Sequence, residues 1–257
     1  MKILCLGDVV GSPGREVIAR TLPDYRVQHS IDFIVANVEN VAAGSGVTRS
    51  SYLVLRNAGI DVCTTGDHVY KRGEILKLFE SDADRLLRPI NYPEAAAGRG
   101  MTTVETASGV SVTVINVQGR VFMDPCDDPF KAVDEALARA PESVIVVDMH
   151  GEATSEKRAI GWHLDGRVAI VFGTHTHVPT ADEEILTKGT AYVTDLGMCG
   201  PYRSVIGRNV EPVLTKFTTN MYAPFSVADG DARACGILVD VDPGSGRATS
   251  IERVVLR

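Results

Sequence analysis

Two histidines stand two residues apart in residues 173–179, directly after the apolar run 168–172. Side chains at this spacing on an extended chain lie on the same face. His175 and His177 can therefore reach a common ligand. Imidazoles are common ligands of transition metals, so this pair indicates a metal site.

Other carboxylate and imidazole side chains also follow short apolar runs. They are Asp8 after residues 3–6, Glu39 and Asn40 after residues 33–35, Asp67 and His68 after residues 62–63, and His150 after residues 144–147. Open α/β sheets bind ligands at the carboxyl ends of their strands, so we expect these side chains to meet there. Mixed carboxylates and imidazoles favour Mn, Fe or Zn over Ca or Mg, and the donors are too many for one ion. The pattern predicts a two-metal site, which is the usual apparatus of phosphoester hydrolysis.

Several of these positions also have an interpretation without metal. Asp8 is compatible with a turn aspartate that accepts local amide hydrogens. The glycines around it do not follow the G-x-G-x-x-G spacing of a dinucleotide-binding fingerprint. Glu39 and Asn40 are compatible with a turn or a helix cap, and His150 with a polar group at a sheet edge. We favour metal ligation because all the clusters share the same strand-end position.

His68 and Arg120 are candidates for contacts with a substrate. Asp67 and His68 are adjacent on a predicted tight turn and point in different directions, so we expect Asp67 to face the metals and His68 to face a leaving group. Imidazole has a pKa near working pH and suits a general acid. Arg120 follows another predicted strand, and its guanidinium matches the geometry of phosphate, although a surface salt bridge is equally compatible. The glycine-rich residues 197–202 are predicted to form a loop.

The composition limits the class of protein. With 257 residues, 44% of them hydrophobic, and no linker or low-complexity stretch, we expect one domain over residues 1–257. A formal net charge of −7 argues against long nucleic acid as a partner. A cytoplasmic protein is the expectation, because we find no secretory signal or membrane span and the five scattered cysteines fit reduced thiols. A homo-oligomer is compatible with the sequence.

Short β-rich runs alternate with helical patterns, which predicts a layered α/β protein with its site at strand carboxyl ends. Strands are predicted at residues 2–6, 33–36, 61–65, 109–116, 143–148, 168–172, 191–194, 236–241 and 249–256. Helices are predicted at residues 15–26, 48–59, 128–140 and 155–164, with Thr48 and Asp128 as N-cap residues. Residues 109–116 alternate as in a strand exposed on one face. The last two strands predict an antiparallel carboxy-terminal portion.

These residues resemble the motifs of the calcineurin-like metallophosphoesterase superfamily, specifically its bacterial YmdB-like branch of cyclic-nucleotide phosphodiesterases. The resemblance extends from the start of the chain to about residue 207. The matching strings are residues 7–11 (GDVVG), 37–40 (NVEN), 66–68 (GDH), 150 (H), 153–157 (ATSEK), 161–163 (GWH) and 173–180 (GTHTHVPT).

The resemblance implies a β-sandwich flanked by helices and a di-iron or di-manganese centre. By motif matching, one metal is surrounded by Asp8, Glu39, Asn40 and His177, while Glu39 bridges to a second metal held by Asp67, His150 and His175. His68 is the implied proton donor. The implied reaction is hydrolysis of 2′,3′-cyclic nucleotides, with other phosphodiesters as further candidates, by attack of a metal-bridging hydroxide.

Two positions depart from this pattern. Asp67 stands where the family's Gly-Asn-His motif has asparagine, which adds a formal negative charge that two divalent or trivalent cations must balance. This charge either favours a trivalent ion or reduces the Lewis acidity that the substrate experiences. Val10 stands where many relatives in the wider superfamily have histidine. Two other functions stay open: a phosphomonoesterase that uses the same metals, and a non-catalytic regulator that binds a metal or a nucleotide.

Overall fold

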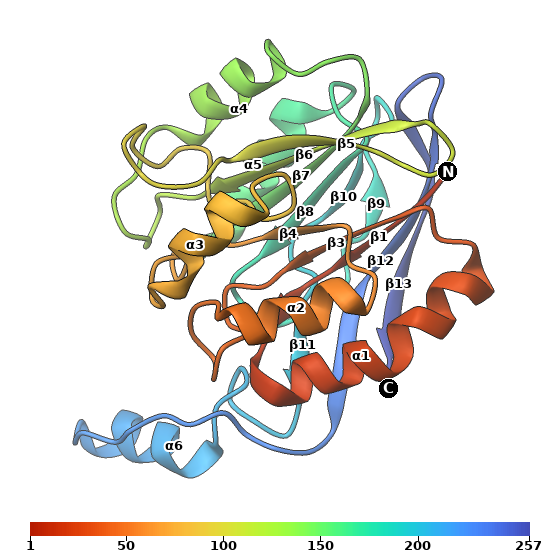
Figure 1. Cartoon of the computed structure of the whole chain (residues 1–257). Helices are drawn as coiled ribbons and strands as arrows, with labels where there is room; N and C mark the ends of the chain where they lie inside the picture. The colour runs from red at the N-terminus through yellow and green to blue at the C-terminus, as the bar shows by residue number, and fades with distance from the viewer.

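Two mixed β-sheets lie face to face in the computed structural model, which describes residues 1–257 (Figure 1). The first sheet consists of β1 (Lys2–Leu6), β2 (Asp8–Val9), β3 (Phe33–Asn37), β4 (Val62–Thr64), β11 (Met198–Pro201), β12 (Ala232–Asp242) and β13 (Arg247–Leu256). Its strand order is β2-β11-β12-β1-β3-β4, and β13 pairs with β12. β1, β3 and β4 run parallel, so their carboxyl ends lie at one edge of the sheet.

The second sheet has the order β5-β6-β7-β8-β10-β9. Its strands are β5 (Met101–Glu105), β6 (Ser111–Gln118), β7 (Val144–His150), β8 (Ile170–Thr174), β9 (Glu184–Ile185) and β10 (Ala191–Val193). β6, β7, β8 and β10 run parallel. The predicted layered α/β fold is therefore confirmed.

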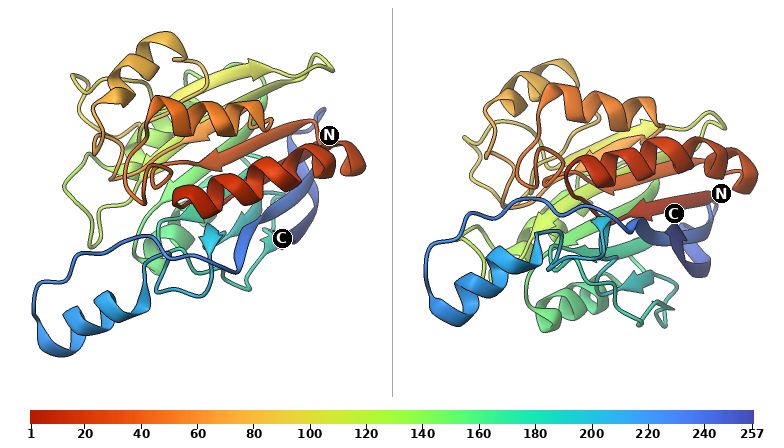
Figure 2. Two further views of the ribbon diagram at one scale, coloured as in Figure 1. Left: turned by 60° about the horizontal axis from the view of Figure 1, so that its bottom comes forward. Right: turned by 90° about the horizontal axis from the view of Figure 1, so that it is seen from below.

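Six helices accompany the sheets: α1 (Gly11–His29), α2 (Arg49–Asn57), α3 (Glu74–Ser81), α4 (Pro129–Leu137), α5 (Thr154–Leu164) and α6 (Val210–Thr219). Helices α1 and α2 cover the outer face of the first sheet, while α4 and α5 cover that of the second (Figures 1 and 2). Helix α6 and the segment after it extend away from both sheets (Figure 2). None of these helices combines the length and apolar character that a membrane span requires.

Alternate residues of the central strands belong to different hydrophobic cores. In β1, Ile3 packs between the two sheets, whereas Leu4 packs beneath the helices of the first sheet. In β7, Val146 packs between the sheets and Val147 packs beneath the helices of the second. Both faces of these strands are thus buried, which holds their carboxyl ends in fixed positions.

Most predicted elements and both predicted caps are present. Thr48 accepts a hydrogen bond from the Ser51 amide in a capping box, and Asp128 accepts from the Phe130 amide at 2.9 Å. Strand β12 pairs antiparallel with β1, β11 and β13, as predicted for the carboxy-terminal portion. Helix α1 begins four residues before the prediction, at Gly11, because a proline in the first helical turn is tolerated.

Two predictions about local structure are wrong. Strand β6 was expected to be exposed on one face, but all its residues after Ser111 are buried. Its polar Thr113 is accommodated because its hydroxyl bonds those of Thr103 at 2.8 Å and Ser143 at 2.7 Å. Residues 197–202 were expected to form a loop, but β11 lies there, parallel to β2 and antiparallel to β12. The glycines of this segment are more typical of loops than of strands, so its strand pairing was not predicted.

Candidate metal centre

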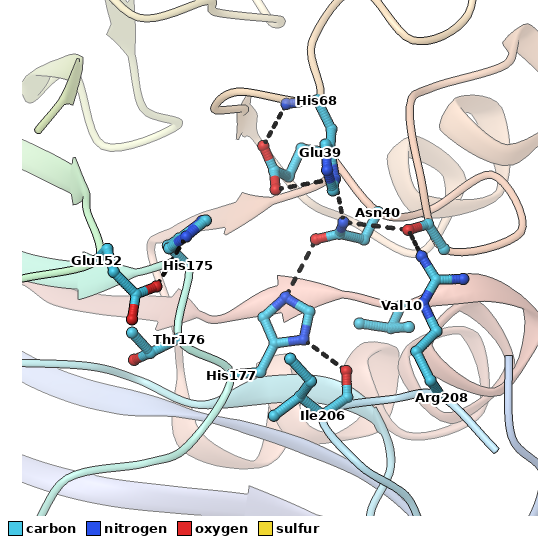
Figure 3. Close-up of a pocket in the computed structure, with 11 residues that line it drawn as sticks. Val10, Glu39, Asn40, His68, Glu152, His175, Thr176, His177, Ile206 and Arg208 are labelled. Carbon is cyan, nitrogen blue, oxygen red and sulfur yellow. Dashed lines mark hydrogen bonds and ion pairs between the residues drawn. The ribbon is translucent and has the colours of Figure 1, made fainter. Parts of the chain in front are cut away.

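The carboxyl ends of five strands meet where the edges of the two sheets face each other. β1, β3 and β4 come from the first sheet, and β7 and β8 come from the second. A pocket of about 250 Å³ opens at this point (Figure 3). It is lined by Val10, Glu39, Asn40, Gly44, His68, Glu152, His175, Thr176, His177, Ile206 and Arg208. The other predicted ligands, Asp8, Asp67 and His150, contact members of this set.

One group of donors consists of Glu39, Asp67, His150 and His175, whose donor atoms all lie within 4.8 Å of one another. His150 Nε2 lies 3.2 Å from Asp67 Oδ1 and 3.4 Å from Glu39 Oε2. His175 Nδ1 lies 3.4 Å from the same Asp67 oxygen. The structure therefore brings together four side chains that the sequence suggested as ligands.

The tautomer of His150 follows from its hydrogen bonds. Thr174 donates its hydroxyl hydrogen to Asp148 Oδ1 at 2.7 Å, so its oxygen accepts from His150 Nδ1 at 2.9 Å. Asn37 also lies near this nitrogen, but its amide hydrogens have nearer acceptors in Thr65 O and Asp148 Oδ2. Nε2 of His150 is then left with a lone pair that faces the Glu39 and Asp67 carboxylates. Groups that only accept hydrogen bonds face one another here, which a bound cation would stabilise.

A second group of acceptors consists of Asp8, Asn40 and His177. The Ile206 carbonyl accepts from His177 Nδ1 at 2.9 Å, so His177 Nε2 carries a lone pair. This nitrogen lies 3.2 Å from Asn40 Oδ1 and 3.9 Å from Asp8 Oδ1. Asp8 Oδ1 is buried and has no hydrogen-bond partner. An orphaned carboxylate oxygen beside two further acceptors fits a second cation.

The electrostatics of the site point the same way. Burial, followed by the charge of Asp67, raises the pKa of Glu39 well above its ordinary range. Burial also raises the pKa of Asp8 to about 7. It lowers the pKa of His150 to about 3, which keeps that imidazole neutral and able to ligate. The protein alone supplies too little positive charge for these carboxylates, so the residues present fit bound metal ions.

His68 lies at the rim of this donor set, with 29% of its side chain exposed. Asn40 Nδ2 donates to His68 Nδ1 at 2.8 Å, so the neutral ring carries its hydrogen on Nε2 (Figure 3). The backbone amide of His68 donates to Glu39 Oε2 at 3.1 Å. Burial is the largest cause that lowers the pKa of His68. The ring is held by its neighbours at the pocket wall, where a substrate can reach it.

A buried ion pair holds the turn that carries His175 and His177. Lys157 Nζ donates to Asp195 Oδ2 at 2.8 Å, and the Thr176 hydroxyl donates to the same oxygen at 2.6 Å. His175 and His177 both have positive φ angles, of 95° and 63°, which L-residues rarely adopt. The contacts of Asp195 with Lys157 and Thr176 support this strained backbone.

The structure separates Arg120 from the pocket. Its guanidinium forms an exposed salt bridge with Asp128 at 3.0 Å, the alternative that the sequence left open. Sequence reasoning missed Arg208, which lines the pocket instead, and Asp148, which orients Thr174. Glu152 was also missed as a partner of His175, whose Nε2 lies 3.1 Å from its carboxylate. The one feature of the sequence that pointed to Glu152 was its position at a strand end, two residues after His150.

Comparison with known proteins identifies similar chains over the full length. A family model described as YmdB-like protein matches residues 4–254. A 2′,3′-cyclic-nucleotide 2′-phosphodiesterase of Bacillus subtilis (strain 168) is 45% identical over 258 residues, covering 100% of this chain and 97% of the relative.

Two solved structures share the fold. A protein from Thermus thermophilus, described as hypothetical, superposes with a TM-score of 0.94 at 42% identity, covering 99% of this chain and 98% of the other. A structure described as a novel phosphatase from Mycoplasma pneumoniae has a TM-score of 0.93 at 33% identity, covering 100% and 93%.

Proposed function

The chain belongs to the YmdB-like family, as its motifs predicted, and we propose that it is a metal-dependent phosphodiesterase that hydrolyses 2′,3′-cyclic nucleotides. The observation that carries this proposal is the convergence of two groups of possible metal ligands on one pocket. One group contains Glu39, Asp67, His150 and His175, and the other contains Asp8, Asn40 and His177. The 45% identity to a 2′,3′-cyclic-nucleotide 2′-phosphodiesterase supports the substrate class. We also propose that residues 1–257 form one metallophosphoesterase domain, since both sheets contribute to one shared core.

Two metal ions are proposed, iron first and manganese as the alternative, because mixed carboxylate and imidazole donors suit these metals. Asp8, Asn40 and His177 would hold one ion, and Asp67, His150 and His175 would hold the other. Glu39 would contribute to both ions, since one of its oxygens lies 3.4 Å from His150 Nε2 in one group and the charge of Asp8 in the other group is among the causes that raise its pKa. When bound, such ions act as Lewis acids toward a phosphoryl group and lower the pKa of water.

The chain's own residues then supply orientation and a proton. Hydrolysis of the cyclic ester forms a bond from water oxygen to phosphorus and breaks the bond to the ribose 2′ oxygen, which takes up a proton and leaves a 3′-monoester. His68 lines the pocket wall and is the proposed donor of that proton in its imidazolium form, which carries a hydrogen on both ring nitrogens and becomes neutral after the transfer. Asn40 orients His68 in its neutral form, because Asn40 Nδ2 donates to His68 Nδ1.

Metal-dependent turnover is the first test. The purified chain, loaded with iron or manganese, is expected to hydrolyse a 2′,3′-cyclic nucleotide, and a chelated sample is expected to be inactive. Glu39→Gln is expected to abolish turnover with the fold intact by circular dichroism. Near-normal activity in E39Q would contradict the assignment of Glu39 as a ligand.

A phosphomonoesterase is the second candidate, favoured by the Mycoplasma pneumoniae structure described as a phosphatase. Both activities would use the same residues, so metal content does not separate them. Turnover of a 2′,3′-cyclic nucleotide and of its 3′-monoester under identical conditions does. A higher kcat/KM for the diester supports the phosphodiesterase, and the opposite order supports the phosphatase.

A further inference from the structure

Arg208 is the only lysine or arginine that lines the pocket. Its side chain lies along the side opposite Glu152 and His175 (Figure 3). Nη1 donates to the Ala43 carbonyl at 3.3 Å, and Nη2 donates to the Gly44 carbonyl. These bonds use two of the five N–H groups of a guanidinium. The other three have no protein acceptor, and no carboxylate lies within ion-pair distance of 4.0 Å.

The loop around residue 44 is shaped to receive this guanidinium. Gly44 has a φ of +84°, and a Cβ built there would lie 2.4 Å from Arg208 Nη1. Any side chain at Gly44 would therefore displace the guanidinium. The charge is held in a half-buried place beside the pocket, where it is only partly solvated.

Arg208 also stands next to the second group of acceptors. The Gly44 carbonyl that it contacts accepts from Asn40 Nδ2 at 3.3 Å, and Asn40 Oδ1 faces His177 (Figure 3). The backbone two residues before Arg208 contributes the Ile206 carbonyl that fixes the His177 tautomer. An anion at the proposed metal site would thus lie beside an unpaired positive charge.

We propose that Arg208 is the anion-recognition residue of this pocket and that its free N–H groups bind a non-bridging oxygen of the substrate phosphate. The inference rests on the proposed function and adds a residue that favours anionic ligands over neutral ones. Guanidinium matches phosphate in shape and forms charge-assisted hydrogen bonds. A phosphate monoester carries about −1.5 to −2 charges at pH 7, compared with one on the cyclic diester, so Arg208 also binds the product.

A purely structural role for Arg208 would be to hold the loop at residues 41–46. Arg15 provides a matched control for that role. Its Nη1 donates to the Val41 carbonyl of the same loop, and Arg15 does not line the pocket. Loss of either arginine removes a contact with the loop, but only loss of Arg208 removes positive charge from the pocket.

The test compares R208M, R208K and R15M with the unmodified chain, each as the full metal-loaded protein. Steady-state hydrolysis of 2′,3′-cyclic AMP gives kcat and KM, and isothermal titration calorimetry with inorganic phosphate gives an affinity that does not depend on turnover. R208M is expected to raise KM and to weaken phosphate binding, each by about tenfold to a hundredfold. R208K is expected to lose less, and R15M to match the unmodified chain in both readouts.

Equal phosphate affinity and equal KM in R208M and R15M would overturn the inference, as would a fall in kcat alone. Absence of phosphate binding to the unmodified chain would overturn it too. If the unmodified chain fails to turn over the cyclic nucleotide but binds phosphate through Arg208, the proposed function fails and the anion site stands.

Discussion

Thr174 connects the buried carboxylate of Asp148 to His150, and Thr174→Val tests whether this connection fixes the histidine as a ligand. Valine keeps the branched shape of threonine and replaces only its hydroxyl with a methyl group. In the structure that hydroxyl donates to Asp148 Oδ1 at 2.7 Å and accepts from His150 Nδ1 at 2.9 Å. All three residues are fully buried, so water does not replace the lost group.

The expected magnitude follows from the groups left without partners. T174V orphans one oxygen of Asp148 and the Nδ1–H of His150, and each such group costs about 1–3 kcal/mol. The free energy of unfolding should fall by about 2–6 kcal/mol. Without its hydrogen-bond acceptor, His150 no longer keeps its Nε2 lone pair aimed at the metal position. Loss of such an outer partner weakens metal affinity by about tenfold to a hundredfold.

The assay pairs urea unfolding of the chelated protein with metal titration against a competing chromophoric chelator. Thr174→Ser is the control, because serine keeps the hydroxyl and loses one methyl group, worth about 1 kcal/mol. T174S should bind metal as the unmodified chain does, while T174V should not. Equal metal affinity in the two variants would refute the argument that the hydroxyl orients His150.

Two further predictions concern packing and pH. A Cβ at Gly66 would lie 2.1 Å from His150, so Gly66→Ala should lower metal content and thermal stability. Gly73→Ala is the control, because its Cβ meets nothing within 4 Å, and it should change both quantities only slightly. Thermal unfolding and elemental analysis check this pair, and equal effects of the two variants would contradict the close packing. Burial raises the pKa values of Asp8 and Asp148 to about 7 from an ordinary value of 3.8, so the folded metal-free protein binds more protons than the unfolded chain between these values. Each of these carboxyl groups should therefore lower the stability by about 2 kcal/mol as pH rises from 5 to 7. His150 offsets part of this fall, because burial lowers its pKa to about 3 and the unfolded chain binds its proton up to about pH 6.5. Urea unfolding with chelator should therefore show a smaller fall in D148N than in the unmodified chain, by about 2 kcal/mol; an equal change in the two would show that Asp148 is ionised in the folded state.

The convergence of the proposed ligand residues was predictable because each follows an apolar run that forms a strand. Parallel strands place their carboxyl ends at one edge, so local patterns around Asp8, His150 and His175 were enough to suggest a common site. The sequence also marked Thr48 and Asp128 as caps, because capping depends on residues only a few positions away.

Features that depend on distant contacts were not predictable in this way. Arg208 reaches the pocket because its guanidinium meets the Gly44 carbonyl, 164 residues earlier in the chain. Asp148 interrupts an apolar strand and gave no sign of its partner Thr174 on the neighbouring strand. Thr113 appeared to belong to an exposed face because its hydroxyl partners lie on other strands or in their flanking turns.

Asp67 and Arg208 together change the charge balance of the proposed site. Asp8, Glu39 and Asp67 carry three negative charges against the four positive charges of two divalent ions, which leaves one; asparagine at position 67 would leave two. Attraction to a phosphate anion scales with this residual charge, so Asp67 weakens the pull of the ions on substrate. Arg208 adds a positive charge at the opposite side of the pocket, where it does not compete with the ions for the carboxylates. The comparison of R208M with R15M therefore also measures how much of the anion attraction lies outside the metal ions.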